Sequence, residues 1–192
     1  MPPWRRPFAL LVLVVAIQRF YELVISRRNE RRSGTPLGTG GKRSFPLMVL
    51  LHMALFWMPL VERRLRPPRP RLAIAGPALV VCALATALRL WVIRSLGIHW
   101  NVRGTVHAGT KVVVIGPYRY LRHPNYVAAA LEMAALPLAG SAPISAALLS
   151  AANALVLIPR VRGEEALLDA IPGYRERMGE KPRFIPRLRP RQ

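Results

Sequence analysis

The chain has little acidic character and almost no cysteine. Nine Asp and Glu residues stand against 29 Lys and Arg in 192 residues, which gives a formal net charge of +20. The single cysteine, Cys82, lies within an apolar run, so a disulfide framework and a thiolate metal site are both excluded. The glycine-rich stretch at 38–41 follows no strand-like run and lacks the spacing of a dinucleotide-binding fingerprint. We therefore expect no metal site and no soluble nucleotide-binding fold.

Apolar residues are abundant, but they are segregated from the charge. The chain is 52% hydrophobic with a mean hydropathy of +0.23. Long apolar stretches alternate with short Arg-rich segments, which is typical of transmembrane helices joined by juxtamembrane loops. Basic clusters also bind nucleic acid, but most of these lie near the ends of apolar runs, where they meet anionic lipid headgroups. We predict an integral membrane protein that contacts membrane lipids and binds no nucleic acid.

The apolar runs predict an all-α polytopic membrane protein with about five transmembrane helices and a cytoplasmic C-terminal helix and tail. The predicted spans cover residues 8–25, 45–61, 72–92, 124–138 and a fifth run that ends near 158. A turn of a few residues around Gly140 separates the last two, which predicts a tight helical hairpin. The tail from residue 159 is polar, and we expect a helix over 160–168 and then a Pro-rich basic end.

The connections carry most of the charge. Residues 26–42 form a predicted basic loop, and we expect its glycine-rich stretch to be a flexible connection. The link over 62–71 contains five Arg. If the C-terminal tail faces the cytoplasm, this link lies outside, which conflicts with the positive-inside rule. No small-residue cleavage site follows the first apolar run, so we expect no cleaved signal peptide.

Residues 94–123 form the only long stretch that is neither simply apolar nor simply basic. The stretch leads into the segment G-P-Y-R-Y-L-R-H-P-N-Y at 116–126. An aromatic belt with basic anchors would explain its Tyr and Arg residues. Such a belt needs neither a Gly-Pro turn nor the His123-Pro124 pair, so we interpret this segment as part of a functional site.

A second cluster follows the fifth apolar run and contains Arg160, Arg162, Glu164 and Glu165. Arg160 and Glu164 are four residues apart, so a simple ion pair on one helix face would explain them. However, two of only nine acidic residues are adjacent here. This pair in so basic a chain indicates a site that holds a cation.

Together these segments resemble the isoprenylcysteine carboxyl methyltransferases and their bacterial relatives, which are similar to the phospholipid methyltransferases. The resemblance covers residues 96–186. It rests on Gly116-Pro117-Tyr118, on Arg122-His123-Pro124-Asn125-Tyr126, on Arg160 with Glu164, Glu165 and Leu168, and on Arg183-Phe184-Ile185-Pro186. It implies an S-adenosylmethionine-dependent integral membrane methyltransferase. We divide the chain into an N-terminal two-span region with basic loops, 1–71, and a catalytic membrane domain with a cofactor-binding loop, 72–192.

The resemblance also implies site residues. The cofactor would contact Thr110, Lys111, Val112, Val113, Tyr118, His123, Pro124, Asn125, Tyr126, Glu164 and Glu165. The family often has His where this chain has Thr110. Arg160 matches the position that the family assigns to the substrate, and it is a predicted catalytic residue. His123 and Glu132 are also predicted catalytic residues, but from their chemistry and not from the resemblance.

The chemistry of these residue types is compatible with the resemblance. S-adenosylmethionine carries a sulfonium, an ammonium, a carboxylate and an adenine, so its site needs an acidic group, a donor and an apolar slot. Glu164, His123 and the aromatic residues supply them. A carboxylate acceptor would need only orientation by Arg160. A phenol, with a reference pKa of about 10, would need a base, for which His123 and Glu132 are candidates. A hydrogen bond between helices would equally explain Glu132, which lies within an apolar span.

We expect a lipophilic substrate methylated on a carboxylate, phenol or enol oxygen, such as a long-chain polyketide or a prenylated compound. The Ala-, Arg- and Pro-rich composition favours a bacterial inner membrane, with the site facing the cytoplasm. Two alternatives stay open. A non-catalytic membrane scaffold would show no cofactor affinity, and a transporter would use polar groups within the spans, such as Glu132.

Overall fold

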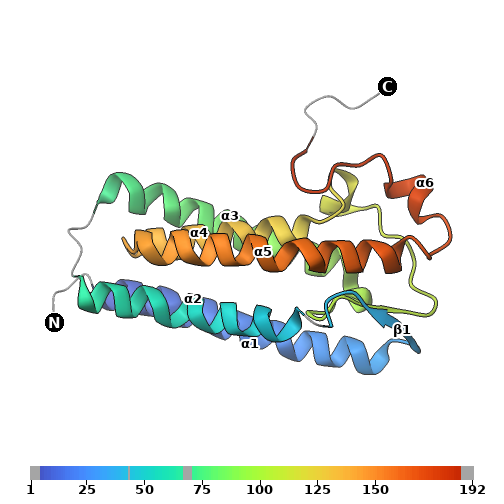
Figure 1. Cartoon of the computed structure of the whole chain (residues 1–192), viewed down its shortest axis with the longest axis horizontal. Helices are drawn as coiled ribbons and strands as arrows, with labels where there is room; N and C mark the ends of the chain where they lie inside the picture. Colours follow the sequence, from blue (N-terminus) through green and yellow to red (C-terminus); the bar gives the residue numbers. More distant parts are fainter. Residues whose placement is uncertain (1–4, 43, 67–70, 187–192) are drawn as a thin grey trace.

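The computed structural model describes residues 5–42, 44–66 and 71–186. Part of the predicted 62–71 link and the basic end after 186 therefore lie outside the described residues. Five long helices run side by side, while the longer loops, two short strands and a small helix gather at one end of the bundle (Figure 1). This arrangement confirms the predicted helical membrane architecture, to which the strands are an addition.

The structure places a helix at each of the five predicted spans. The helices are α1 (Arg5–Arg32), α2 (Phe45–Leu65), α3 (Leu72–Leu96), α4 (Pro124–Ala139), α5 (Pro143–Leu168) and the small α6 (Tyr174–Met178). Among the described residues, α1, α2, α3 and α5 are long and apolar enough to cross a membrane. The 16 residues of α4 fall short of a full span. Because α4 packs between α3 and α5, it is nevertheless part of the same bundle.

Two predicted boundaries are wrong. The first helix does not end near residue 25 but runs on to Arg32, so it takes in the start of the predicted 26–42 loop. The fifth helix continues through Pro159 to Leu168, so the predicted 160–168 helix is its last part. An internal proline removes one backbone hydrogen bond. Here the buried side chains Leu157 and Arg160 on either side keep the helix together through packing.

The glycine-rich stretch is not a flexible connection. Its first residues belong to β1 (Pro36–Thr39), which pairs antiparallel with β2 (Thr105–His107). A Cβ atom on Gly40 would overlap the backbone of α5 at Gly163 and Glu164. Only glycine lets two backbones approach this closely. Glycine at this position therefore allows close packing and does not indicate flexibility.

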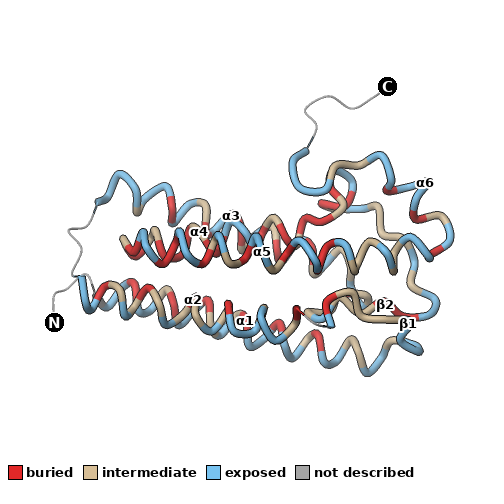
Figure 2. Tube along the Cα trace, viewed as in Figure 1, coloured by how far each residue is buried: buried red, intermediate tan, exposed pale blue. Residues whose placement is uncertain are grey.

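One apolar core joins the N-terminal helices to the rest of the bundle. It contains Phe8, Val12, Val15, Leu51, Leu55, Cys82, Met133, Ala135, Leu136 and Leu149. These side chains come from α1 to α5, so the two predicted regions, 1–71 and 72–192, share this core. The outward faces of the helices are exposed (Figure 2) and carry large apolar side chains such as Phe20, Leu50 and Leu84. A lipid environment accounts for such a surface.

Four of the buried charged side chains contact one another inside the helical bundle. Nη2 of Arg19 donates to both carboxylate oxygens of Glu132, at 2.7 and 2.9 Å, and Nη2 of Arg89 donates to Glu132 at 3.2 Å. Glu22 forms an ion pair with Arg19 and lies 3.8 Å from Arg89. Two cations thus balance two anions, as buried charges require. We call Arg19, Glu22, Arg89 and Glu132 the buried quartet.

Two charges of the Arg-rich link have structural roles at the opposite end of the bundle. Arg63 donates to the carbonyl oxygen of Gly140, and its guanidinium lies 4.6 Å from the centre of the Phe8 ring. Glu62 accepts hydrogen bonds from the backbone N–H groups of Ile144 and Ser145, at 3.1 and 2.6 Å, where α5 begins. Arg63 is therefore a buried packing residue and not an exposed loop charge.

Candidate active site

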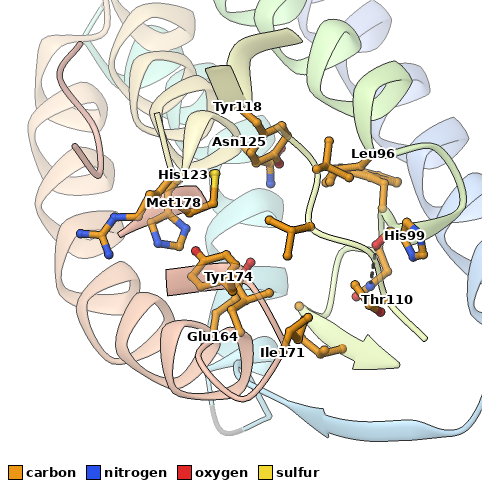
Figure 3. Close-up of a pocket in the computed structure, with 18 of the residues that line it drawn as sticks. Leu96, His99, Thr110, Tyr118, His123, Asn125, Glu164, Ile171, Tyr174 and Met178 are labelled. Carbon is orange, nitrogen blue, oxygen red and sulfur yellow. Dashed lines mark hydrogen bonds between the residues drawn. The ribbon is translucent and has the colours of Figure 1, made fainter. Parts of the chain in front are cut away.

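A cavity lies at the end of the bundle where the loops gather, and we call it the polar cavity. Three parts of the chain form its walls: the end of α3 with the following loop, the start of α4, and the end of α5 with α6. Figure 3 shows Leu96, His99 and Thr110 on one side, with His123 and Glu164 across the space from them. The cavity is therefore built from segments that are distant in the sequence.

The Gly-Pro turn and the His-Pro pair fix the loop that enters α4. Gly116 has a φ of +59°, and a Cβ there would overlap Ser95 on α3, so glycine is needed for both conformation and space. The short 3-10 turn η2 (Gly116–Arg119) then places Tyr118 in the wall of the cavity. Pro124 is the first residue of α4, and it disfavours a helical conformation at His123. His123 is thereby held outside the helix, beside the cavity.

The hydroxyl of Tyr126 connects the two predicted motifs. It donates to Glu164, and it accepts a hydrogen bond from Nε of Arg160 at 3.0 Å. Nη2 of Arg160 donates to the carbonyl oxygen of Val102. Instead of the simple ion pair that would explain their spacing, Arg160 and Glu164 therefore share Tyr126 as a common partner.

The adjacent acid, Glu165, has a different role. Its carboxylate lies 3.1 Å from Nε2 of His123, 3.2 Å from Arg122 and 2.7 Å from Arg183. The hydrogen bond to Glu165 raises the pKa of Arg183 above its ordinary value. The acidic pair is thus divided: Glu164 lines the cavity, while Glu165 orients His123 and holds the C-terminal tail.

The C-terminal tail is hydrogen-bonded to the backbone just before α4, at Arg122 and His123. The backbone N–H groups of Arg122 and His123 donate to the carbonyl oxygens of Pro182 and Arg183, at 3.0 and 3.1 Å. Nζ of Lys181 donates to the carbonyl oxygen of Tyr118 at 2.8 Å. Partial burial lowers the pKa of Lys181. These bonds explain why the tail segment belongs to the same constellation as the His-Pro pair.

Polar atoms around the cavity are buried but lack partners. Among the described residues no hydrogen-bond partner exists for Trp100 Nε1, Arg122 Nε, Asn125 Oδ1, Arg160 Nη1 and Tyr174 Oη. Buried polar atoms are nearly always hydrogen-bonded. Burial raises the pKa of Tyr174 to about 12, so its hydroxyl remains a donor. A set of unpaired donors and acceptors around one cavity indicates a ligand that carries both kinds of group.

Most predicted site residues come together here. The walls include Thr110, Lys111, Val112, Val113, Tyr118, His123, Asn125, Tyr126, Arg160 and Glu164. Pro124 and Glu165 lie next to these residues in the chain but do not line the cavity. Glu132 belongs to the buried quartet, and both its oxygens are bound by Arg19 and Arg89. The structure therefore does not bring Glu132 to the polar cavity, and it offers no support for the predicted catalytic role.

Other cavity residues escaped the sequence analysis. Trp100 is 2% exposed and lines the cavity. Ile171, Tyr174 and Met178 also line it, from a tail segment with no predicted function. Tyr174 and Met178 are four residues apart on one face of α6, and Ile171 lies in the turn before it. This pattern in a polar tail was the available signal that the segment returns to the protein.

A second cavity, which we call the lateral cavity, lies alongside the polar cavity between the helices. Phe45, Met48 and Phe56 of α2 form an apolar wall. Leu23 of α1 and Met53 of α2 also line it and are 40% and 50% exposed, so the cavity reaches the outer surface of the bundle. Both cavities are lined by Trp100, Asn125, Tyr126 and Arg160. A polar space and a largely apolar space therefore meet at these four residues.

Comparisons with known proteins give a consistent result. The model of the isoprenylcysteine carboxyl methyltransferase (ICMT) family matches residues 78–170. The chain is similar to the uncharacterized protein YpbQ of Bacillus subtilis (strain 168), with 31% identity over 162 residues, which are 84% of this chain and 96% of that protein.

Among solved structures, the chain is similar in fold to the eukaryotic intramembrane Ras methyltransferase ICMT. The TM-score is 0.57 at 21% identity, over 69% of this chain and 48% of that one. The chain thus spans about half the length of that protein, and the likeness concerns the fold alone.

Proposed function

Because the chain belongs to the isoprenylcysteine carboxyl methyltransferase family, we propose that it is a membrane enzyme that transfers a methyl group from S-adenosylmethionine to an oxygen of a lipophilic small molecule. The observation that carries this proposal is the meeting of the polar and lateral cavities at Arg160 and Tyr126. A water-soluble cofactor and a lipid substrate need separate access and one point of contact. The two cavities supply both.

The unpaired groups of the polar cavity fit S-adenosylmethionine. Trp100 Nε1 and Arg122 Nε are donors suited to its carboxylate. Asn125 Oδ1 accepts from an ammonium, and the carboxylate of Glu164 balances positive charge. When bound, the cofactor supplies an electrophilic methyl group attached to a sulfonium.

The remaining wall suits an adenine ring. Residues 111–114 have no regular secondary structure, and within the described part of the chain they form no backbone–backbone hydrogen bond. Their free amide and carbonyl groups are able to pair with the edge of a purine. Ile171 and Met178 add apolar surface for its faces. The chain needs no glycine-rich fingerprint to hold such a ring.

Arg160 is the residue that orients the acceptor oxygen. Its Nη1 is a buried donor without a partner among the described residues, and the guanidinium lies where the cavities meet. A carboxylate acceptor is already ionised and needs only this contact. For a phenol or enol, Tyr126 accepts the proton while passing its own proton to Glu164, to which it is hydrogen-bonded. His123, the alternative base, directs Nε2 at Glu165 instead.

The lateral cavity accommodates the hydrocarbon part of the substrate. Its apolar wall on α2 and its exposed mouth near Leu23 and Met53 provide entry from the bilayer. The basic last turn of α1, with Arg31 and Arg32, lies at the same end of the bundle as the polar cavity. By the positive-inside rule this end faces the cytoplasm, so the cofactor enters from there, and a bacterial inner membrane is the proposed location.

A scaffold without catalysis and a transporter fit less well. A scaffold would not need several unpaired polar atoms around one cavity. A transporter would use Glu132 for its substrate, but this carboxylate is held by Arg19 and Arg89. A methyltransferase uses the unpaired polar atoms to bind its cofactor and does not need a free carboxylate at Glu132.

Methyl transfer to host lipids tests the proposal directly. Purified full-length protein is incubated with methyl-labelled S-adenosylmethionine and lipids extracted from its own host, and the labelled product is identified by mass spectrometry. We expect label in a lipid fraction with the wild type and almost none with Arg160→Ala. Binding of S-adenosylhomocysteine without labelled lipid in any fraction would count against the proposed reaction.

A further inference from the structure

The last turns of α1 hold the loop that follows α3. Nδ2 of Asn29 donates to the carbonyl oxygens of Gly97 and Trp100, at 2.9 and 2.8 Å. One turn earlier in α1, Oγ of Ser26 accepts a hydrogen bond from the backbone N–H of Val102 at 3.1 Å. Ser26 and Asn29 are neighbours on one helix face. The N-terminal helix therefore supports a loop that lines both cavities.

The loop is also held on the side away from α3. The side chain of Asn101 accepts from the backbone N–H of Thr105 and donates to the carbonyl oxygen of the same residue, both at 2.8 Å. Thr105 begins β2, which pairs with β1. Val102 thus lies in a turn that Asn101 closes, and its N–H is bound by Ser26. These contacts fix the direction in which Val102 presents its carbonyl oxygen.

The carbonyl oxygen of Val102 is one of two anchors for the guanidinium of Arg160. It accepts from Nη2, while the hydroxyl of Tyr126 accepts from Nε at 3.0 Å. A guanidinium is planar, so two held nitrogens determine where the third one lies. That third nitrogen, Nη1, is buried and has no partner among the described residues. Val102 and Tyr126 together therefore direct the donor that is assigned to the acceptor oxygen.

A purely structural role would also explain the hydroxyl of Ser26. A buried N–H needs an acceptor, and leaving the N–H of Val102 unpaired would cost stability. Ser26 is 1% exposed, so water has little access to take its place. The two explanations differ in what the loss of this hydroxyl changes. A structural role affects stability alone, whereas a role in the reaction also affects the geometry at Arg160.

We propose that Ser26 is a positioning residue for methyl transfer. By holding the N–H of Val102, it fixes the carbonyl oxygen that anchors Arg160, and thereby the direction of Nη1 toward the acceptor oxygen. This inference rests on the proposed function and extends the active site into the N-terminal helix. Because Asn29 holds Trp100 separately, the cofactor side of the loop does not depend on Ser26.

The kinetics of Ser26→Ala test the inference on full-length protein in lipid nanodiscs. The assay uses methyl-labelled S-adenosylmethionine and the host lipid fraction that the wild type labels. A misdirected guanidinium orients the acceptor poorly, so we expect kcat to fall about tenfold. The affinity for S-adenosylhomocysteine should stay within about twofold of the wild type, because Trp100 is still held. Ser26→Cys has nearly the same size and keeps a weaker acceptor, so its kcat should be intermediate.

A double-mutant cycle with Arg160→Ala separates positioning from a structural role. If Ser26 acts through Arg160, adding Ser26→Ala to Arg160→Ala should lower kcat by less than about twofold. Two independent losses that multiply would overturn the inference. If Ser26→Ala does not fold, the same cycle is measured with Ser26→Cys.

Ser145→Ala is the matched control. Ser145 is 2% exposed, and its hydroxyl donates to Glu62 at 2.6 Å at the opposite end of the bundle. This variant also removes a buried hydrogen bond, but one that has no contact with Arg160, so kcat per folded protein should be unchanged. An equal fall of kcat in Ser145→Ala and Ser26→Ala would overturn the inference, because a general loss of stability would then explain both.

The outcomes separate this inference from the proposed function. If the wild type methylates a host lipid but the losses in the cycle multiply, the positioning role fails while the proposed function stands. If the wild type labels no host lipid, the proposed function fails, and the positioning role fails with it.

Discussion

The polar cavity and the buried quartet both contain charged side chains, but the hydrogen-bond pairing of these side chains differs between the two regions. Around the polar cavity, the polar atoms of Trp100, Asn125 and Arg160 are left without partners among the described residues. In the quartet, each carboxylate has a guanidinium partner, and the charges sum to zero. Water or a ligand can satisfy groups at the end of the bundle, whereas groups deep inside it must satisfy one another. Several unpaired polar atoms around one cavity thus mark the binding site better than charge does, whereas in the quartet the Nε atoms of Arg19 and Arg89 lack partners among the described residues although the charges balance.

The largest expected effect comes from breaking the quartet. Glu132→Leu leaves two buried arginines competing for Glu22, and we expect it to lower the free energy of unfolding by about 4 kcal/mol. The double variant Glu132→Leu/Arg89→Leu should recover much of this loss, because the Arg19–Glu22 pair remains neutral. Unfolding in detergent, followed by circular dichroism, measures both.

An exposed ion pair provides the control for this prediction. Asp169 and Arg175 form a pair at 2.8 Å, with side chains 36% and 77% exposed. Asp169→Asn should have little effect on unfolding, because solvent screens this pair. If the double variant is no more stable than Glu132→Leu, the quartet does not work as a balanced set.

The second effect concerns turnover in the polar cavity. Arg160→Ala removes the donor at the meeting point of the two cavities and should lower kcat about 100-fold, while the affinity for S-adenosylhomocysteine changes much less. Arg162→Ala, on the exposed side of the same helix, is the control. Equal losses of kcat and cofactor affinity in Arg160→Ala would place this residue in the cofactor site rather than at the acceptor.

A smaller effect is expected at Glu164, on the affinity for the cofactor. Glu164→Gln keeps the shape but removes the charge that balances the cofactor, so we expect cofactor affinity to fall about 30-fold with the fold intact. Glu176→Gln, at an exposed acid on α6, should not change the affinity. Calorimetric titration with S-adenosylhomocysteine measures this difference, and unchanged affinity in Glu164→Gln would move the cofactor away from α5.

The smallest effect is a pH dependence. The reference pKa of tyrosine is about 10, and burial raises the pKa of Tyr174 to about 12. Between these values the unfolded chain releases the proton first, so stability falls as the pH rises from about 10 to about 12, by at most about 2 kcal/mol. Tyr174→Phe should flatten this part of the curve and leave stability at neutral pH nearly unchanged. An identical alkaline decline in the variant would show that other groups cause it.

The sequence predicts the approximate places of the five long helices and the meeting of two motifs at one cavity. Long apolar runs identify membrane helices almost by themselves, and the segments at 116–126 and 160–165 were predicted to share a cavity from the family resemblance. The structure brings these segments together through Tyr126, Glu164 and Arg160. The roles of these residues in cofactor and substrate binding remain predictions.

What the sequence could not supply were contacts between distant segments. Nothing local shows that Arg19 and Arg89 reach Glu132, so the sequence leaves a catalytic role and a contact between helices both open for this acid. Likewise, glycine favours flexibility in a single segment, and only the facing backbone of α5 reveals that Gly40 is packed closely. In both cases, tertiary partners determine the role of a residue.

Titration of the purified wild-type protein with S-adenosylhomocysteine in an isothermal calorimeter tests the central claim most directly. If the polar cavity holds the methyl donor, binding is saturable, has one site per chain and is weakened by Glu164→Gln but not by Glu176→Gln. Absence of saturable heat from folded protein in nanodiscs would contradict the account, whatever lipid the lateral cavity binds.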